Sequence, residues 1–277
     1  MALPNFLIIG AAKAGTTSLY HYLRQHPDVF MSPVKEARYY WSEGQAEGIV
    51  PIRTRAAYER LFDDVTVERA IGEASPQYLN SEAAPTRIAA DLPDARLIVA
   101  LRNPAERAYS SYLGRLRGGR ERRGLDEAMQ PGTYYFETSL YYPRLSRYFD
   151  RFDRNRIKVI LFEDFVADTR GALREIHEFL GVDAGFATDF TERHNPALVP
   201  RSLIANEIFC RTVQAVRDLL PESMLGSGLA GGAQKLFLLR RPERFAPPVR
   251  ARLLEQFRSD IAQTSALIGR DLSKWLE

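Results

Sequence analysis

The feature that most constrains the fold is a short segment near the N-terminus, residues 5–19, which reads NFLIIGAAKAGTTSL. Residues 6–9 form a brief apolar run typical of a strand, and residues 10–15 form a loop of small residues with one cation, Lys13. From Thr16 the apolar positions recur at three and four residues, which predicts a helix. A strand, a glycine-bearing loop and a helix N-terminus, in this order, direct several backbone N–H groups at one anion. The segment therefore predicts a phosphate or sulfate site.

This loop differs from the Walker A motif, GxxxxGK[ST], in which the lysine follows the second glycine. Here Lys13 precedes Gly15, and Thr16 and Thr17 follow it. The lysine is therefore expected in the bend of the loop and not in the first turn of the helix. A turn that needs glycine only for backbone reasons is the alternative for this segment taken alone.

Composition and charge exclude several classes of protein. A formal net charge of +3 gives no argument for a nucleic-acid partner. Cys210 is the single cysteine, so neither an intrachain disulfide nor a cysteine-based zinc site is expected, and no other spacing suggests a metal site. The N-terminal apolar run is too short for a signal peptide or a membrane span. We therefore expect a cytoplasmic protein without a transmembrane segment.

Short aliphatic runs alternate with helical patterns over the first two thirds of the chain. Strands are expected at residues 6–9, 28–31, 70–72, 96–101 and 157–162, with helices at 16–23, 83–92, 104–117, 141–152 and 169–180. This alternation predicts an α/β fold of three layers, with a central parallel sheet flanked by helices. The last third is different, with helical patterns at residues 203–220 and 247–261 around a stretch rich in glycine, serine and alanine. We predict one domain over residues 1–277 with a variable helical or loop insertion at about 197–246.

A second candidate anion site follows the strand predicted at Arg96–Leu101. Arg102 comes at the carboxyl end of this strand, where open α/β sheets bind ligands, and Ser110 lies in the next helix. Arg102 could instead pair with a carboxylate, and Ser110 could be a surface hydroxyl. If both loops bind anions, a nucleotide with phosphates at both ends of its ribose would fit them.

The two motifs together resemble those of the sulfotransferases that use 3′-phosphoadenosine 5′-phosphosulfate (PAPS), in particular the heparan sulfate sulfotransferase branch and its bacterial relatives. The 5′-phosphosulfate loop of that family, GxxKxGT, is matched by residues 10–16, and its Arg-[Asp/Asn]-Pro segment with a serine eight residues on is matched by Arg102, Asn103, Pro104 and Ser110. The resemblance runs to about Gly181 and resumes at residues 268–272. It implies a P-loop-like sulfotransferase domain, PAPS as the donor, adenosine 3′,5′-bisphosphate as the product, and no metal.

The resemblance also implies roles for the residues of both motifs. Lys13 would stabilise the leaving phosphate oxygen, and Arg102 with Ser110 would clamp the 3′-phosphate and select PAPS over ATP. The 5′ group would be held by backbone amides of the loop and by the hydroxyls of the two threonines. The residues concerned are Ala14, Gly15, Thr16, Thr17 and Ser18.

The base is expected in a third segment, residues 35–41, which resembles the Lys-Glu segment of the family. Glu36 takes the place of the glutamate that deprotonates the acceptor, and Lys35 would help to hold the donor or the sulfuryl group. Alternatively, Glu36 is a surface carboxylate paired with Lys35 or Arg38. Another sulfotransferase branch uses a histidine base, for which the candidates are His21, His26, His177 and His194, with His194 the first to test.

The acceptor is expected near residues 73–76, EASP, which resemble a Glu-Lys-[Thr/Ser]-Pro segment of the heparan-modifying members. Ala74 replaces the lysine, which argues against a highly sulfated glycan acceptor. The candidate acceptor site consists of Lys35, Ser75, Tyr78 and His194. We expect in-line transfer to a hydroxyl, less readily to an amine, on a glycan, glycolipid or small metabolite. The sequence does not indicate the oligomeric state.

Two other functions fit parts of this pattern. A P-loop kinase or NTPase would need a lysine after the second glycine and a magnesium-binding aspartate at a strand end. Lys13 precedes the second glycine, so the required lysine is missing. Arg102 occupies the strand end at which the magnesium-binding aspartate would be expected. A nucleotide-binding protein without catalytic activity is the third alternative.

Overall fold

The computed structural model describes residues 2–41, 52–191, 199–200, 202, 205–206, 208–213, 239–240 and 245–277. Two compact units are present. The first consists of Met1–Pro104, Leu140–His194 and Phe257–Glu277, and the second of Ala105–Ser139 and Asn195–Gln256. Each unit is therefore built from segments that are distant in the sequence.

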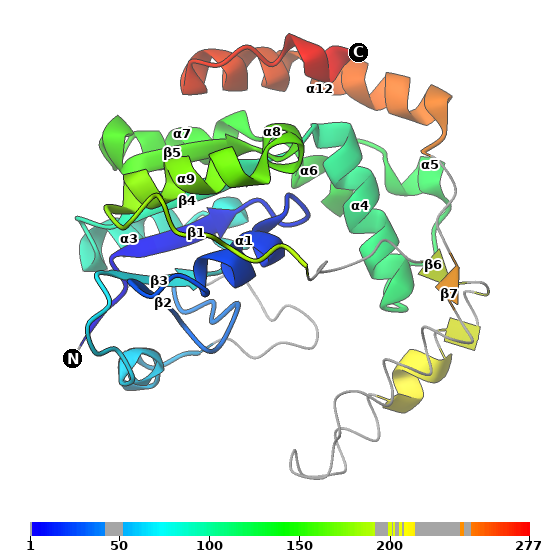
Figure 1. Cartoon of the computed structure of the whole chain (residues 1–277). Coiled ribbons are helices and arrows are strands. Elements are labelled where there is room, and N and C mark those ends of the chain that lie inside the picture. Colours follow the sequence, from blue (N-terminus) through cyan, green and yellow to red (C-terminus); the bar gives the residue numbers. More distant parts are fainter. Residues whose placement is uncertain are drawn as a thin grey trace. The chain divides into compact units, whose positions relative to one another are not determined.

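The first unit contains a five-stranded parallel sheet with the strand order β2-β3-β1-β4-β5 (Figure 1). The strands are β1 (Phe6–Gly10), β2 (Val29–Met31), β3 (Ala70–Ala74), β4 (Arg96–Leu101) and β5 (Ile157–Leu161). All five residues of β1 are buried, as expected for the central strand of a sheet with both faces covered. The predicted α/β fold with a central parallel sheet is confirmed.

Helices cover both faces of this sheet. The helices of the unit are α1 (Thr16–Leu23), α2 (Arg55–Glu59), α3 (Ala84–Asp91), α7 (Tyr142–Phe149), α8 (Phe162–Ala167) and α9 (Thr169–Leu180), with short 3₁₀ turns η1 (Arg60–Phe62), η2 (Tyr78–Asn80), η3 (Arg154–Arg156) and η5 (Ser273–Leu276). In Figure 1, α1 and α9 lie on the near face of the sheet. Tyr148 on α7 donates a hydrogen bond to the carbonyl of Tyr78 on η2 at 2.7 Å.

Local sequence signals explain where these elements pack and end. The Phe6 ring packs directly against Gly72 in β3. A Cβ at this position would be only 2.1 Å from the ring, so a larger residue would not fit. The helix α9 begins at the Asp168 carboxylate, which accepts a hydrogen bond from the N–H of Gly171 at 2.8 Å, and ends at Gly181 with a left-handed φ of 75°.

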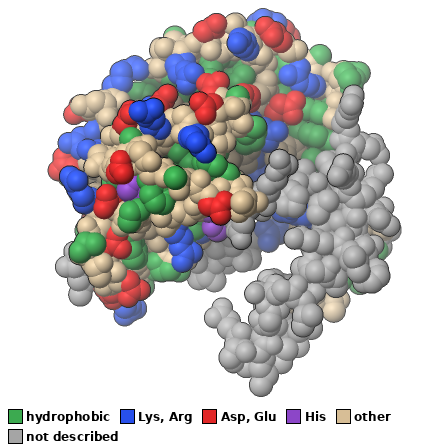
Figure 2. All heavy atoms as spheres, in the orientation of Figure 1, with side chains coloured by type: hydrophobic (Ala, Val, Ile, Leu, Met, Phe, Trp, Pro, Cys, Tyr) green, Lys and Arg blue, Asp and Glu red, His purple; other side chains and the backbone are tan. Residues whose placement is uncertain are grey.

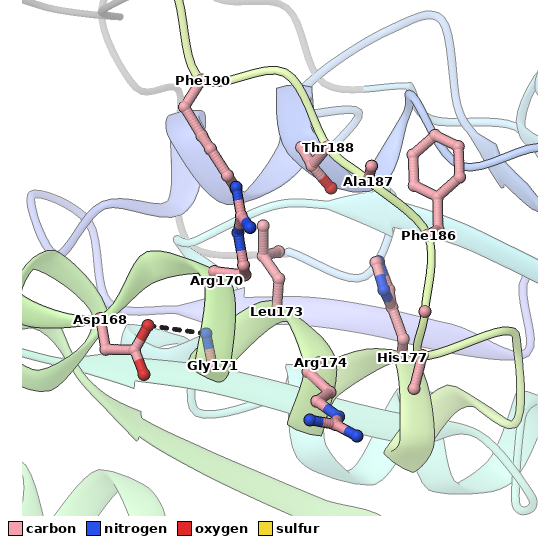
Figure 3. Close-up of a pocket in the computed structure, with 12 residues that line it drawn as sticks. Asp168, Arg170, Gly171, Leu173, Arg174, His177, Phe186, Ala187, Thr188 and Phe190 are labelled. Carbon is pink, nitrogen blue, oxygen red and sulfur yellow. Dashed lines mark hydrogen bonds between the residues drawn. The ribbon is translucent and has the colours of Figure 1, made fainter.

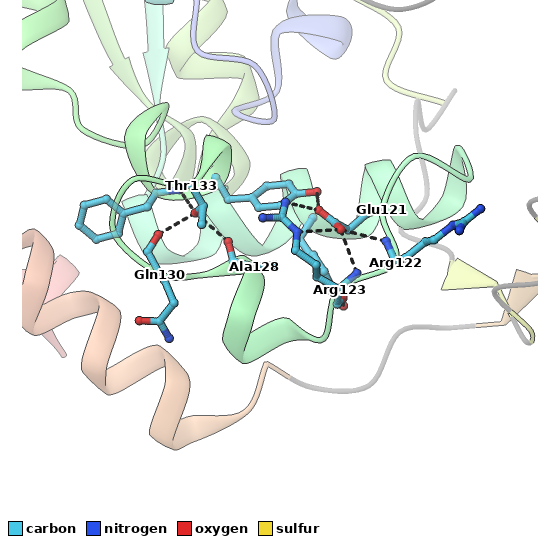
Figure 4. Close-up of polar contacts among 9 residues, drawn as sticks. Glu121, Arg122, Arg123, Ala128, Gln130 and Thr133 are labelled. Atoms are coloured by element: carbon cyan, nitrogen blue, oxygen red, sulfur yellow. Dashed lines mark hydrogen bonds and ion pairs between the residues drawn. The ribbon is translucent and has the colours of Figure 1, made fainter.

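The second unit contains α4 (Pro104–Arg117, of which Pro104 belongs to the first unit), α5 (Leu125–Ala128), α6 (Tyr134–Glu137) and the antiparallel pair β6 (Val199–Pro200) and β7 (Leu239–Arg240). The buried Glu121 carboxylate organises the loop before α5 (Figure 4). Its oxygens accept hydrogen bonds from the N–H of Arg122, from the Arg123 backbone and side chain, and from the Tyr135 hydroxyl. Hydrogen bonds from Arg123 outweigh burial and lower the pKa of Glu121 to about 2.

The C-terminal helix α12 (Pro247–Ile268) starts in the second unit and ends in the first. The helical pattern expected at residues 203–220 is described only at 205–206 and 208–213, where the chain is helical. Most of the predicted insertion at 197–246 lies outside the described residues, so the arrangement of one domain with an insertion stays a prediction. Among the described helices, none has the length and apolar character needed to cross a membrane.

Candidate functional site

The loop after β1 has the backbone geometry of an anion site. Lys13 and Gly15 both have left-handed φ values, 75° and 85°, and Gly15 occupies the N-cap position of α1. Glycine has no side chain to cap the helix, and the first turn of α1 contains no acidic residue. The N–H groups of that turn and the positive end of the helix dipole are therefore suited to a negatively charged group. Lys13 itself is exposed.

Packing against α8 fixes the position of this loop. A Cβ at Gly15 would lie 3.1 Å from the Phe162 ring, so the loop is pressed closely against the start of α8. Ala14 is buried and its N–H donates to the carbonyl of Ala11 at 3.2 Å. Thr16 is buried, while Thr17 and Ser18 are partly exposed. Thr17 and Ser18 are therefore more accessible to a ligand than Thr16.

The structure brings Arg102 to the same loop. The Arg102 guanidinium lies 4.8 Å from the Phe162 ring centroid, and its Nη1 is 3.4 Å from the carbonyl oxygen of Lys13. The buried Tyr141 hydroxyl donates to the Arg102 carbonyl at 2.8 Å and accepts from the Arg102 N–H at 3.4 Å. Two cations are thus held at the carboxyl ends of the neighbouring strands β1 and β4, as expected for an open α/β sheet.

Further contacts anchor the segment after Arg102. The N–H of Asn103 donates to Glu163 at 2.9 Å, and its side-chain amide donates to the carbonyl of Trp275 at 2.7 Å. No pattern in the sequence indicates the roles of Tyr141, Glu163 and Trp275, because these contacts join residues far apart in the chain. Ser110 lies on α4 in the other compact unit, and its pairing with Arg102 stays a prediction.

Substituting Arg102 by alanine is expected to weaken binding of adenosine 3′,5′-bisphosphate roughly tenfold or more, since a charge-assisted hydrogen bond to a phosphate would be lost. Titration calorimetry on both proteins measures this change. Arg156→Ala is the matched control, because Arg156 pairs with exposed Asp94 and lies before β5. Equal affinity of Arg102→Ala and the unaltered protein would contradict the role of Arg102.

The segment after β2 places Glu36 against the end of β3. Its N–H donates to the carbonyl of Ala74 at 2.9 Å, and its φ of 65° is left-handed, as is the φ of 55° at Arg38. The Glu36 carboxylate receives three charged or amide donors: Lys35 Nζ at 2.9 Å, Arg38 Nη2 at 2.6 Å and Gln77 Nε2 at 2.7 Å. Since β3 is adjacent to β1, Glu36 lies at the same edge of the sheet as the loop of Lys13.

The surroundings of Glu36 favour its ionised form. Burial by itself would raise the pKa of Glu36, but the charge of Lys35 and hydrogen bonds from Arg38, Lys35 and Gln77 outweigh it and lower the pKa to about 2. The side chain of Glu36 is 24% exposed and is therefore partly accessible from outside. It is therefore a deprotonated group at neutral pH that is accessible to a ligand. The pairing of Glu36 with Lys35 and Arg38, the alternative to a role as base in the sequence analysis, is present in the structure.

Ser75 and Tyr78, predicted for the acceptor site, are completely buried. Ser75 Oγ accepts a hydrogen bond from the N–H of Arg38 at 3.0 Å, and the Tyr78 hydroxyl accepts one from the N–H of Tyr40 at 3.3 Å. These two side chains therefore support the segment that carries Glu36. Lys35 is partly exposed beside Glu36, and His194 lies outside the described residues.

Two of the remaining histidines, His26 after α1 and His177 on α9, pack against each other. His26 accepts from the N–H of Asp28 at 3.0 Å, its other ring nitrogen lies 2.9 Å from the carbonyl of Asp183, and its ring contacts that of His177 at 4.7 Å. Burial lowers the pKa of His177 to about 4. In the described part of the chain, no group of three or more His, Cys, Asp or Glu side chains is placed to hold a metal ion.

The buried His177 predicts a loss of stability in acid. Its pKa of about 4 in the folded state is below the ordinary value of 6.5, so the unfolded chain binds the proton more readily. Stability is complete above pH 6.5 and falls by on the order of 3 kcal/mol as the pH drops towards 4. Urea unfolding at pH 7.5 and 5 should show a smaller difference for His177→Leu than for the unaltered protein. His21→Gln is the control, and an undiminished difference in His177→Leu would contradict this assignment.

A cavity of about 500 Å³ lies between α9 and the segment at residues 184–190 (Figure 3). Arg170, Leu173 and His177 line it from α9, and Phe186 and Phe190 line it from the segment. The predicted donor and acceptor residues are not among its lining residues. On the face seen in Figure 2, basic and acidic side chains of the described residues are interspersed.

Three comparisons relate this chain to known proteins. A family model described as "Sulfotransferase family" matches residues 46–186. A crystal structure of a sulfotransferase from Alicyclobacillus acidocaldarius is 32% identical, with 100% of both chains covered and a TM-score of 0.77.

Two curated relatives match shorter stretches. Membrane-associated sulfotransferase kil1 of Dictyostelium discoideum is 37% identical over 112 residues, covering 40% of this chain and 23% of the relative. Human bifunctional heparan sulfate N-deacetylase/N-sulfotransferase 2 is 39% identical over 121 residues, covering 40% of this chain and 13% of the relative. The chain thus matches less than a quarter of the length of either of these relatives.

Proposed function

The chain belongs to the sulfotransferase family, and we propose that it transfers the sulfuryl group of PAPS to a hydroxyl of a glycan, glycolipid or small metabolite. The observation that carries this proposal is the placement of Lys13, Arg102 and Glu36 at the carboxyl ends of neighbouring parallel strands. The loop after β1 presents a helix N-terminus without a side-chain cap and Lys13. The end of β4 presents Arg102, and the carboxylate of Glu36 lies at the end of β3. These are the groups needed to hold a doubly anionic nucleotide and to take a proton from an acceptor.

The loop residues fit a phosphosulfate. The first turn of α1 begins at a Gly15 N-cap and its N–H groups are not capped by a side chain, and Lys13 adds a positive charge in the loop bend. PAPS, when bound, supplies an activated sulfuryl group on its 5′-phosphate. Lys13 would stabilise the charge that develops on the phosphate oxygen as the sulfur–oxygen bond breaks, and the N–H groups of residues 15–18 would orient the 5′ group. Arg102, with Ser110, would bind the 3′-phosphate.

Glu36 is proposed as the general base of an in-line displacement. The acceptor oxygen would form its bond to sulfur as Glu36 takes its proton, and adenosine 3′,5′-bisphosphate would leave from the opposite side. Because Glu36 is ionised, it is in the form that accepts a proton. Its basicity would rise if Lys35 turned from Glu36 towards the sulfuryl group, since the Lys35 charge contributes to the low pKa.

The acceptor remains defined only by class. The relative whose name includes N-sulfotransferase acts in heparan sulfate modification, which keeps an amine as the second acceptor class. Ala74 lies at the end of β3 where the heparan-modifying members carry lysine, which favours an acceptor with fewer sulfate groups. The predicted cytoplasmic location stays a prediction, and one relative is described as membrane-associated.

Incubation of the protein with ³⁵S-labelled PAPS or γ-³²P-labelled ATP, with a chelator present and a panel of acceptors, tests the proposed function. We expect release of adenosine 3′,5′-bisphosphate from PAPS, with ³⁵S on an acceptor, and no transfer from ATP. Transfer from ATP that needs magnesium would instead indicate a P-loop kinase. Binding of the nucleotide without any turnover of PAPS would indicate a protein without catalytic activity.

A further inference from the structure

The turn that carries the proposed base is strained. Glu36 and Arg38 have left-handed φ values of 65° and 55°, a region that residues with a Cβ adopt at an energetic cost. Such conformations persist only where the surrounding structure holds them. The contacts that hold this turn therefore decide where the Glu36 carboxylate points.

Three hydrogen bonds, each donated by a backbone N–H, connect the turn and Tyr40 to the end of β3 and the residues after it. The N–H of Glu36 donates to the carbonyl of Ala74 at 2.9 Å, and the N–H of Arg38 donates to Ser75 Oγ at 3.0 Å. The N–H of Tyr40 donates to the Tyr78 hydroxyl at 3.3 Å. Two of the three acceptors are side-chain oxygens, which can rotate unless something orients them.

Glu73 orients the first of these oxygens. The Ser75 hydroxyl donates its single hydrogen to Glu73 Oε2 at 2.9 Å, which leaves a lone pair of Ser75 Oγ for the N–H of Arg38. Without a carboxyl oxygen at this place, the hydroxyl would rotate towards another acceptor. Glu73 is thus linked to the backbone of Arg38 through one intermediate side chain.

Filling this position with a carboxyl is costly for the fold. Glu73 is completely buried, and burial raises its pKa to about 7, although the hydroxyl groups of Tyr78, Ser75 and Tyr58 around it act in the opposite direction. The titratable groups that face it are Glu36 on the turn, Tyr58 on α2, Tyr78 on η2 and, after the turn, Tyr40. Glu73 is therefore a buried acid that packing alone would not favour, and it accepts a hydrogen bond from Ser75, the serine that contacts the turn of Glu36.

We propose that Glu73 is a positioning residue, which fixes the left-handed turn at residues 36–38 through Ser75 and so aims the Glu36 carboxylate. The inference rests on the proposed function, because it gives Glu36 the role of base. Glu73 itself is buried and acts through Ser75, without touching donor or acceptor.

Hydrogen exchange of the Arg38 amide tests the link directly. Ser75→Ala removes the acceptor of this amide, and Glu73→Leu removes the group that orients it. Exchange should be roughly fivefold faster in both, the effect of one typical hydrogen bond on an opening equilibrium. Glu73→Gln retains an acceptor oxygen and should restore the exchange rate. Ser81→Ala is the control, since it removes a serine that accepts from the N–H of Ala84 at the start of α3.

Turnover shows whether the turn matters for the base. In Ser75→Ala and Glu73→Leu, the kcat for conversion of PAPS to adenosine 3′,5′-bisphosphate should fall roughly tenfold, the size of a modest loss of orientation, with KM for PAPS unchanged. Glu73→Gln should keep the kcat of the unaltered protein. If Glu73→Leu does not fold, Ser75→Ala carries the test.

Unchanged Arg38 exchange in Ser75→Ala would overturn the proposal, as would a Glu73→Gln variant as defective as Glu73→Leu. Failure of the proposed function has a different signature. The unaltered protein would then neither bind adenosine 3′,5′-bisphosphate nor convert PAPS, while the exchange results would still report on the turn.

Discussion

Replacing Lys13 by alanine is expected to lower kcat for PAPS turnover by about 10²–10³-fold, the usual effect of removing one group that stabilises a developing oxyanion. Lys13 is the only cation in residues 10–18, and its left-handed φ of 75° places it in the loop bend before α1. The N–H groups of the α1 first turn remain in the variant. Binding of adenosine 3′,5′-bisphosphate should therefore decline much less than turnover.

The control for this prediction is Lys158→Ala. Lys158 lies on β5 and pairs with the exposed Glu175 at 2.8 Å, so its loss changes the same charge elsewhere in the unit. Steady-state rates with ³⁵S-labelled PAPS measure both variants. Comparable kcat in Lys13→Ala and in Lys158→Ala would remove Lys13 from the transfer step.

Replacing Glu36 by glutamine is expected to reduce kcat by about 10²–10⁴-fold, the range of general-base catalysis. Glutamine has nearly the shape of glutamate but keeps only one acceptor oxygen. Lys35 donates to Oε1 at 2.9 Å and Arg38 to Oε2 at 2.6 Å in the native protein, so one of these two donors loses its partner in the variant. Because the shape is nearly retained, the variant tests proton acceptance more than packing. Affinity for adenosine 3′,5′-bisphosphate, measured by calorimetry, should be unchanged.

Glu175→Gln provides the matched control, because Glu175 pairs with Lys158 on the surface and lies on α9. A Glu36→Gln variant with native turnover would transfer the role of base to another residue. His194 is the next candidate in that case, and His194→Ala in the same assay would decide.

The five strands of the parallel sheet and its longer helices followed from patterns that are local in the sequence, whereas the order of the strands was not predicted. The apolar run of β1, the small residues before Gly15 and the strand ending at Arg102 each set the backbone over a few residues. Because carboxyl ends of parallel strands meet at one edge, the proximity of Lys13 and Arg102 could be predicted without any contact being known.

Contacts over long separations could not be predicted in this way. The clamp of Tyr141 on Arg102 and the hydrogen bond from Asn103 to Trp275 join elements whose positions depend on the whole fold. The buried state of Ser75 and Tyr78 likewise results from tertiary packing around β3, although both lie beside a recognisable motif. Glu73 belongs to that motif too, but its role depends on the hydroxyl of Ser75 and on the turn at Arg38.

Use of PAPS is the central claim, and one measurement tests it most directly. Titration calorimetry in the presence of a chelator compares adenosine 3′,5′-bisphosphate with ADP, which carries the same number of phosphates but has both at the 5′ position. We expect the 3′,5′-bisphosphate to bind at least about tenfold more tightly, because Arg102 would gain a charge-assisted contact that ADP cannot make. Equal affinity, or tighter binding of ADP, would contradict the assignment of the loop at Lys13 and of Arg102 to PAPS.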